Sequence, residues 1–153
     1  MLDGFQRKPP FFEIGPKSYL FGDDVLQLAL AADAAAKKYD VDIISPPPLV
    51  ELRRVAEATS RIFVFAPHMD PILPGRGLAD TLPESLVAAG AKGVMLNHCE
   101  KPLSLAALTQ TIRRADEVGL ATIVCTDTAA ESAAVAKLRP HTIGARPTRG
   151  VGN

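Results

Sequence analysis

Apolar and polar positions follow two different patterns along the chain from about residue 11 onward. Short, nearly continuous apolar runs predict strands that are covered on both faces. Longer segments with an apolar residue every three or four positions predict helices. The two patterns alternate, which gives six strands and five helices. The predicted strands are Phe11–Gly15, Val41–Ser45, Ile62–Ala66, Gly93–Asn97, Ala121–Cys125 and His141–Ala145.

The helical segments have apolar faces and recognisable ends. Arginines and acids occupy the side opposite the apolar face, which predicts that the helices pack onto the sheet. Proline or serine precedes several helices and glycine follows some of them. The two clearest apolar faces consist of Val25, Leu28, Ala32 and Ala36, and of Leu105, Leu108, Ile112, Ala115 and Val118. The other helix markers are Pro46–Pro48 before Leu49, Leu52 and Val55, then Pro83, Gly90, Ser104 and Gly119.

Regular alternation of strands and helices predicts an α/β fold in which βα units surround a parallel sheet. Periodicity alone leaves two architectures open, an open doubly wound sheet and a closed eight-stranded barrel. The 153 residues contain no repeat and no long linker, so they predict one domain or part of one.

Composition and charge exclude several function classes. Lysine plus arginine and aspartate plus glutamate are balanced at 17 each, so no overall field draws the chain to nucleic acid or an anionic membrane. The start of the chain lacks the continuous apolar segment of a signal peptide, and we therefore expect a cytoplasmic protein. Cys99 and Cys125 have no zinc-finger or CxxC spacing, which favours two reduced thiols at buried or site-edge positions.

Polar residues follow the first and fourth predicted strands, at the ends where both architectures bind ligands. Lys17 could bind a phosphate or a developing oxyanion. His98, with Glu100 two residues later, could polarise a carbonyl or transfer a proton. Each residue also has a structural interpretation, because loop lysines are commonly only solvated and isolated histidines are more commonly structural.

Three further patterns give weaker hypotheses. His68 and Asp70 have the spacing of two metal ligands and His98 could be a third, but no further cluster completes a coordination shell. Cys99 beside His98 suggests a thiolate nucleophile, although adjacent residues of a strand point to opposite faces and we favour a packing role. Gly75–Gly77 lacks the third glycine of a dinucleotide-binding fingerprint. We therefore predict neither a metal nor a cofactor.

Taken together, Lys17, the segment Asn97–Glu100 and the spacing between them resemble the triosephosphate isomerase family, particularly its shorter archaeal-like and related bacterial members. Phe65–Pro71 and Ile112–Leu120 are similar to the third-strand loop and the fourth helix of that group. The resemblance runs from about Phe11 to the C-terminus. It implies a TIM (β/α)8 barrel and an aldose-ketose isomerase of small sugar phosphates, as in glycolysis.

The resemblance also implies residue roles. In that family a lysine and a histidine stabilise the enediolate that forms when a glutamate moves a proton between adjacent carbons. By position, Lys17 would be the electrostatic lysine, His98 the electrophile, and Glu100 the carboxylate that accompanies the histidine loop. Gly15 stands where the family has an asparagine, which changes substrate binding at the first strand. A tetrulose phosphate is therefore as plausible a substrate as a triose phosphate.

Arg146 occupies the position of the catalytic glutamate, because Pro147 and Gly152 keep the register of the family. A guanidinium stays protonated and cannot abstract a carbon-bound proton. We expect an incomplete TIM barrel of about six parallel strands alternating with five helices, formed by one partial domain that spans 1–153. Its ends would be an N-terminal extension at 1–10 and a remnant of the lid loop at 146–153. We expect this chain to be inactive by itself.

Six strands would leave two barrel edges unpaired and expose apolar surface. We expect a homo-oligomer or assembly with a complementing chain. Leu78–Asp80 replaces the threonine-glycine element through which the family dimerises, so ordinary dimerisation does not follow. A non-catalytic remnant or interaction module that assembles through the barrel edges is the competing hypothesis. A third is that the recorded C-terminus is not natural, through truncation or a sequence error near Gly144.

Overall fold

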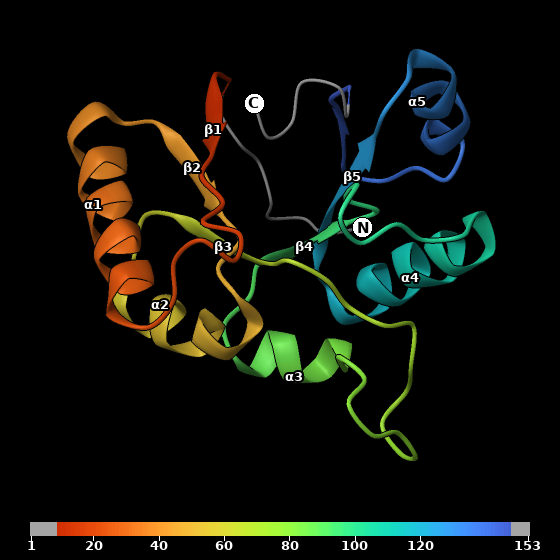
Figure 1. Ribbon diagram of the computed structural model, residues 1–153, viewed down its shortest axis with the longest axis horizontal. Helices are drawn as coiled ribbons and strands as arrows, with labels where there is room; N and C mark the ends of the chain where they lie inside the picture. Colours follow the sequence, from red (N-terminus) through yellow and green to blue (C-terminus); the bar gives the residue numbers. More distant parts are fainter. Residues whose placement is uncertain (1–8, 148–153) are drawn as a thin grey trace.

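A computed structural model of the chain describes residues 9–147. Figure 1 shows strands on the inside and helices around the outside of a curled wall. The strands are β1 (Phe11–Glu13), β2 (Asp42–Ser45), β3 (Phe63–Ala66), β4 (Gly93–Leu96), β5 (Ala121–Thr126) and β6 (Thr142–Ala145). The helices are α1 (Asp23–Tyr39), the 3-10 turn η1 (Leu49–Glu51), α2 (Leu52–Ala58), α3 (Pro83–Ala88), α4 (Leu105–Val118) and α5 (Ala129–Ala136).

All neighbouring strands are parallel, and their spatial order β1-β2-β3-β4-β5-β6 follows the order in the sequence. A doubly wound sheet would reverse its strand order at a switch point, and this sheet does not. The structure therefore confirms the incomplete TIM barrel of six parallel strands and five helices. Within residues 9–147, β1 and β6 form the two edges of the sheet and do not pair with each other.

Two apolar clusters hold the wall together. The larger one lies between the convex face of the sheet and the helices, and includes Ile43, Val94 and Val124. The smaller one lies on the concave face. Side chains alternate between these two faces along each strand. The buried residues of the concave cluster are Ile44, Phe65, Ala121 and Ile123.

Several predicted helix ends are confirmed. The Ser104 hydroxyl accepts a hydrogen bond from the Ala107 N–H at 3.2 Å and caps α4. Gly119 ends α4 in the left-handed region, at φ 79°, which glycine adopts without strain. Pro83 starts α3 as predicted. Local sequence signals thus fix where these helices begin and end.

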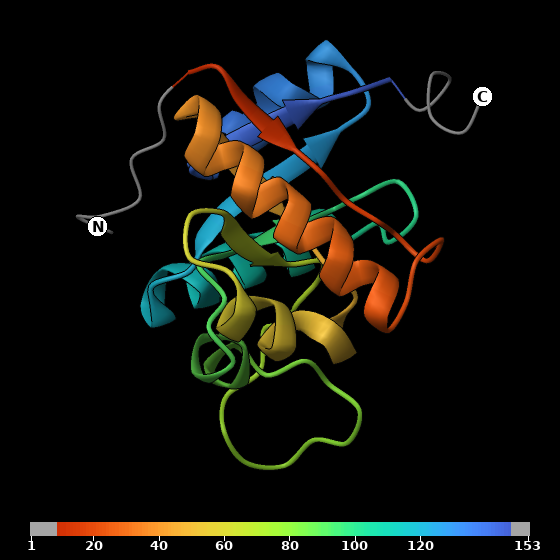
Figure 2. The ribbon, with the colours of Figure 1, turned by 90° about the vertical axis from the view of Figure 1, so that its left-hand side faces the viewer.

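Two expectations about α4 were wrong. Leu105 was predicted on the buried face, but its side chain is 62% exposed, because it lies in the first turn at the mouth of a cleft. Arg114 was predicted on the polar face, but it is only 8% exposed. Its guanidinium bonds Glu84 at 2.7 Å, Glu117 at 2.6 Å and the Ile72 carbonyl at 3.0 Å. Arg114 therefore ties α4 to α3 and to the loop after β3, which projects from the wall in Figure 2.

Most of the predicted N-terminal extension (1–10) and lid-loop remnant (146–153) lies outside the described residues. Among residues 9–147, no helix combines the length and the apolar character that crossing a membrane requires.

Candidate active site

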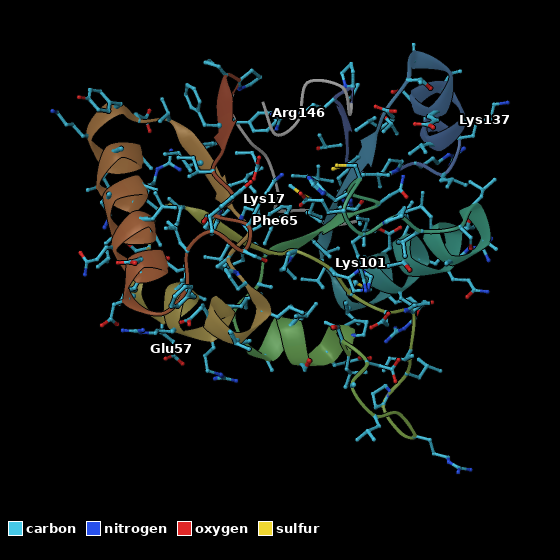
Figure 3. All side chains as sticks on the ribbon, viewed as in Figure 1. Lys17, Glu57, Phe65, Lys101, Lys137 and Arg146 are labelled. Carbon is cyan, nitrogen blue, oxygen red and sulfur yellow. The ribbon has the colours of Figure 1, made fainter. Side chains whose placement is uncertain are left out.

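A cleft of about 840 Å³ lies where the strands end, on the concave side of the sheet. Residues from the loops after β1, β4, β5 and β6 line it, which places all of the predicted site residues around one space. In Figure 3, Lys17 lies near the middle of the molecule and Arg146 lies above it, between the two arms of the wall. Its lining includes the ionisable residues Glu13, Lys17, His98, Glu100, Cys125 and Arg146.

Lys17 reaches the cleft from the turn that follows β1, and its backbone is in the left-handed region at φ 50°. Its Nζ lies 3.3 Å from Glu100 Oε1, so the ends of β1 and β4 are joined by an ion pair. The pair is solvent-accessible, and such pairs contribute at most about 1 kcal/mol to stability. Its clearer consequence is positional, because it holds the ammonium beside the His98 loop.

Asn97 fixes the His98 loop. It adopts φ 57°, a conformation in which asparagine is several-fold enriched, and so turns the chain at the end of β4. Its amide donates to the Cys125 carbonyl at 3.0 Å, and its Oδ1 accepts from the Leu103 N–H at 2.9 Å. Sequence reasoning gave Asn97 no role of its own, although an asparagine directly after a strand was the available signal.

The His98 ring has a defined orientation. The Glu100 N–H donates to its Nδ1 at 3.2 Å. A neutral imidazole that accepts at Nδ1 carries its proton on Nε2. The Glu100 carboxylate lies farther from Nδ1, at 3.7 Å, so we assign the tautomer from the shorter backbone hydrogen bond. The ring can therefore donate a hydrogen bond through Nε2.

Glu13 is a cleft residue that sequence reasoning missed. Its carboxylate lies over Gly15, with Oε1 only 2.6 Å from the point where a Cβ at position 15 would be. Glu13 is exposed to solvent through the opening of the cleft, but other residues that line the cleft surround its carboxylate. The pKa of Glu13 is raised, because burial outweighs the lowering by the positive charges of Arg146 and Lys17. A carboxylate within a strand, two residues before a strand-end glycine, was the signal in the sequence.

The two cysteines line the cleft as free thiols. Cys99 Sγ lies 3.7 Å from His98 Nδ1. The expectation that these neighbours point apart was wrong. Both residues lie beyond the end of β4, so the alternation of side chains along a strand does not apply to them. Burial, with smaller contributions from Glu13 and Cys99, raises the pKa of Cys125 to about 11, so Cys125 stays a thiol at neutral pH.

Arg146 lines the cleft from the position directly after β6. Ile143 packs against the convex core, so alternation turns residues 144 and 146 to the concave side. The Arg146 N–H donates to the Thr126 carbonyl at 2.9 Å and extends the pairing of β6 with β5. Within residues 9–147, its guanidinium has no hydrogen bond or ion pair.

The hypothetical metal ligands do not converge. His68 Nε2 bonds Asp70 Oδ1 at 3.2 Å, and Asp70 Oδ2 accepts from the Thr81 N–H at 2.7 Å. These contacts fold the loop after β3, and His68 and Asp70 do not line the cleft with His98. In the described part of the chain, no three histidine, cysteine or acidic side chains are grouped as a metal site.

Known proteins with similar sequences and folds point to one family. The triosephosphate isomerase family model matches residues 17–142. The chain is 35% identical over 146 residues to triosephosphate isomerase of Methanoculleus marisnigri, covering 94% of this chain and 65% of the relative. It is 32% identical over 149 residues to the enzyme of Methanobacterium bryantii, covering 96% of this chain and 66% of that relative.

A crystal structure of triosephosphate isomerase from Bartonella henselae has the same fold at 22% identity, with a TM-score of 0.68 over 84% of this chain and 56% of that one. The chain thus spans about 65% of the length of the curated relatives that it matches. Because the family model covers most of the described strands and helices, the chain belongs to the triosephosphate isomerase family.

Proposed function

We propose that the cleft binds a small sugar phosphate, a triose or tetrulose phosphate, and polarises it as an aldose-ketose isomerase does, without completing turnover in this chain. The observation that carries the proposal is the shared cleft of Lys17, His98 and Glu100, with an arginine at position 146. Family membership supports the substrate class and the reaction type.

The two polar groups have distinct roles in this proposal. The Nε2–H of His98 donates to the carbonyl oxygen of the ligand, and the Lys17 ammonium stabilises the negative charge that grows there. Glu100 positions both groups through its backbone N–H to His98 and its carboxylate to Lys17. Gly15 leaves room beside them that the Glu13 carboxylate partly occupies.

Arg146 is the reason for the missing turnover. Isomerisation requires a group that accepts a carbon-bound proton and returns it to the adjacent carbon. A guanidinium remains protonated at any usable pH and cannot do so. The cleft therefore retains the groups that stabilise an enediolate but has no base at the position where the family has one.

An isomerase assay coupled to a dehydrogenase tests this proposal on triose and tetrulose phosphates. We expect no turnover by the chain, either by itself or with an added fragment that supplies the two further βα units of an eight-stranded barrel. Arg146→Glu with that fragment should gain turnover. Turnover by the unaltered chain that His98→Ala abolishes would overturn the proposal of inactivity.

A second candidate function is a non-catalytic interaction module. The observation that favours it is the pair of edges at β1 and β6, where Phe12 is 55% exposed. Such a module would assemble with a second copy or a complementing chain. Light scattering after size-exclusion chromatography distinguishes these states, and a stable monomer would contradict assembly through the edges.

A further inference from the structure

Glu13 and Arg146 are charged cleft residues that the proposed isomerase chemistry does not use. Glu13 is the last residue of β1 and Arg146 directly follows β6, and both line the cleft on the concave side of the sheet. Within residues 9–147, neither side chain makes a hydrogen bond or an ion pair. The cleft thus presents an acceptor and a cation whose hydrogen-bonding capacity is available to a ligand.

The two groups are near enough to influence each other. Arg146 contributes the larger of the two electrostatic effects that lower the pKa of Glu13, ahead of Lys17. Cys125, which lies on β5 beside β6, is influenced by both, since Glu13 raises its pKa and Arg146 lowers it. Glu13 and Arg146 therefore lie within one small region but are not in direct contact.

Lys17, another cation of this cleft, is already engaged. The Lys17 ammonium is held by Glu100 at 3.3 Å, whereas the guanidinium of Arg146 is exposed. Arginine presents a planar fork of donors that matches phosphate oxygens, and charge-assisted hydrogen bonds of this kind are about twice as strong as neutral ones. An anionic group that enters the cleft would find Arg146 as its available bidentate partner.

We propose that Glu13 and Arg146 form a ligand-binding pair for small hydroxylated phosphate monoesters, in which Arg146 binds the phosphate and Glu13 accepts a hydrogen bond from a hydroxyl group. This inference rests on the proposed function and adds the residues that select the ligand. Because position 146 holds an arginine in place of the family's glutamate, the position of the base becomes an anion-binding position. A carboxylate beside it selects ligands that also carry a hydroxyl donor.

An NMR titration of the whole chain tests the pair with two ligands of equal charge, glycerol 3-phosphate and n-propyl phosphate. We expect cleft resonances to shift with both ligands, and glycerol 3-phosphate to bind several-fold more tightly, as one hydrogen bond predicts. Arg146→Gln should weaken the binding of both by at least about tenfold. Glu13→Ala should abolish the preference for the hydroxylated ligand.

The role of Glu13 is measured by the preference for glycerol 3-phosphate over n-propyl phosphate, and not by the affinity for either ligand. Removing a negative charge strengthens the binding of any anion, so Glu13→Ala alters both affinities for an electrostatic reason. A loss of the difference in affinity between the two ligands, by contrast, requires a specific contact between Glu13 and the hydroxyl groups. Matched controls are Lys137→Gln at the end of α5 and Glu57→Ala in α2, which remove one positive and one negative charge far from Arg146 in Figure 3. Both should leave affinity and preference unchanged.

The outcomes separate this inference from the proposed function. If Lys17→Gln abolishes binding while Arg146→Gln and Glu13→Ala leave affinity and preference unchanged, the pair is refuted and the proposed function stands. If wild type binds the two ligands equally, the role of Glu13 is refuted. If neither ligand shifts any cleft resonance, the pair and the proposed sugar-phosphate site are both refuted.

Discussion

The ring of Phe65 fills the space that a side chain at position 93 would need. A Cβ added to Gly93 would lie 2.4 Å from two ring atoms of Phe65 and 2.6 Å from the Ala121 carbonyl oxygen. Gly93 pairs with Phe65 on β3 and with Ala121 on β5, so the absent side chain lets three strands close around one buried ring, labelled in Figure 3.

Gly93→Ala should therefore destabilise the fold by about 3 kcal/mol, because the clash involves a fully buried ring and a backbone oxygen that cannot both move away. Urea unfolding followed by circular dichroism measures the loss. Gly144→Ala is the matched control, since its added Cβ would meet neighbours only at 3.8 Å or more. Equal stability of the two variants would contradict the packing described for the concave cluster.

Arg114→Met should lower the free energy of unfolding by about 2 kcal/mol, because it removes hydrogen bonds to Glu84, Glu117 and the Ile72 carbonyl from a site that is only 8% exposed. The loop after β3 should also become more susceptible to limited proteolysis. Arg113→Met changes the preceding, exposed arginine and should stay within about 0.5 kcal/mol of wild type. Similar losses in both variants would contradict a specific role for Arg114.

Asp33 should make the fold acid-sensitive. Burial alone would raise the pKa of Asp33, but hydrogen bonds from Lys37 and from the N–H groups of Arg61, Ser60 and Ile62 outweigh burial and lower the pKa to about 2. The unfolded chain, with a pKa near 3.8, then binds the proton more tightly than the folded chain. The resulting stability, about 2 kcal/mol, is present above pH 4 and is lost as the pH falls toward 2.

Urea unfolding at several pH values between 6 and 2 measures this dependence. Asp33→Asn should be less stable than wild type at pH 6, and the difference should shrink on acidification. Asp24→Asn, an exposed change in the first turn of the same helix, should show the wild-type dependence. A constant difference between Asp33→Asn and wild type at all pH values would count against the lowered pKa.

The two thiols should react at different rates. A pKa of about 11 for Cys125 leaves about a hundredfold less thiolate than the ordinary value of 9.0, whereas Cys99 is exposed. Alkylation by iodoacetamide at pH 8, followed by mass spectrometry, should modify Cys99 first. Cys99→Ser should remove the fast reaction and leave the slow one. Faster modification of Cys125 would be inconsistent with the raised pKa that its partial burial produces.

Local sequence patterns were sufficient for most of the fold. Short β-rich runs, several of them continuously apolar, located all six strands, and Ser104 and Gly119 marked the ends of α4 through contacts within a few residues. Arg114 escaped prediction because its partner Glu84 lies 30 positions away. Helical periodicity places an arginine outside unless a distant partner neutralises it, and a single sequence does not reveal that partner.

Part of the candidate site could also be predicted from the sequence, and the rest depends on the assembled sheet. Lys17, His98 and Arg146 follow strand ends, and parallel strands bring those ends together, so their meeting in one cleft followed from the fold. Glu13 was missed because a charged residue within a strand has no periodic signal. Its position depends on which face of β1 is concave, and only the assembled sheet determines that face.

Deuterium exchange measures whether the cleft, in which Lys17 and His98 would face a bound sugar phosphate, can remove a carbon-bound proton although Arg146 cannot accept it. A triose phosphate is incubated with the chain in D2O, and proton NMR follows its carbon-bound hydrogens. We expect the exchange rate to stay at the value of the protein-free solution, in wild type and in His98→Ala alike. Exchange above that value in wild type, lost in His98→Ala, would contradict this expectation.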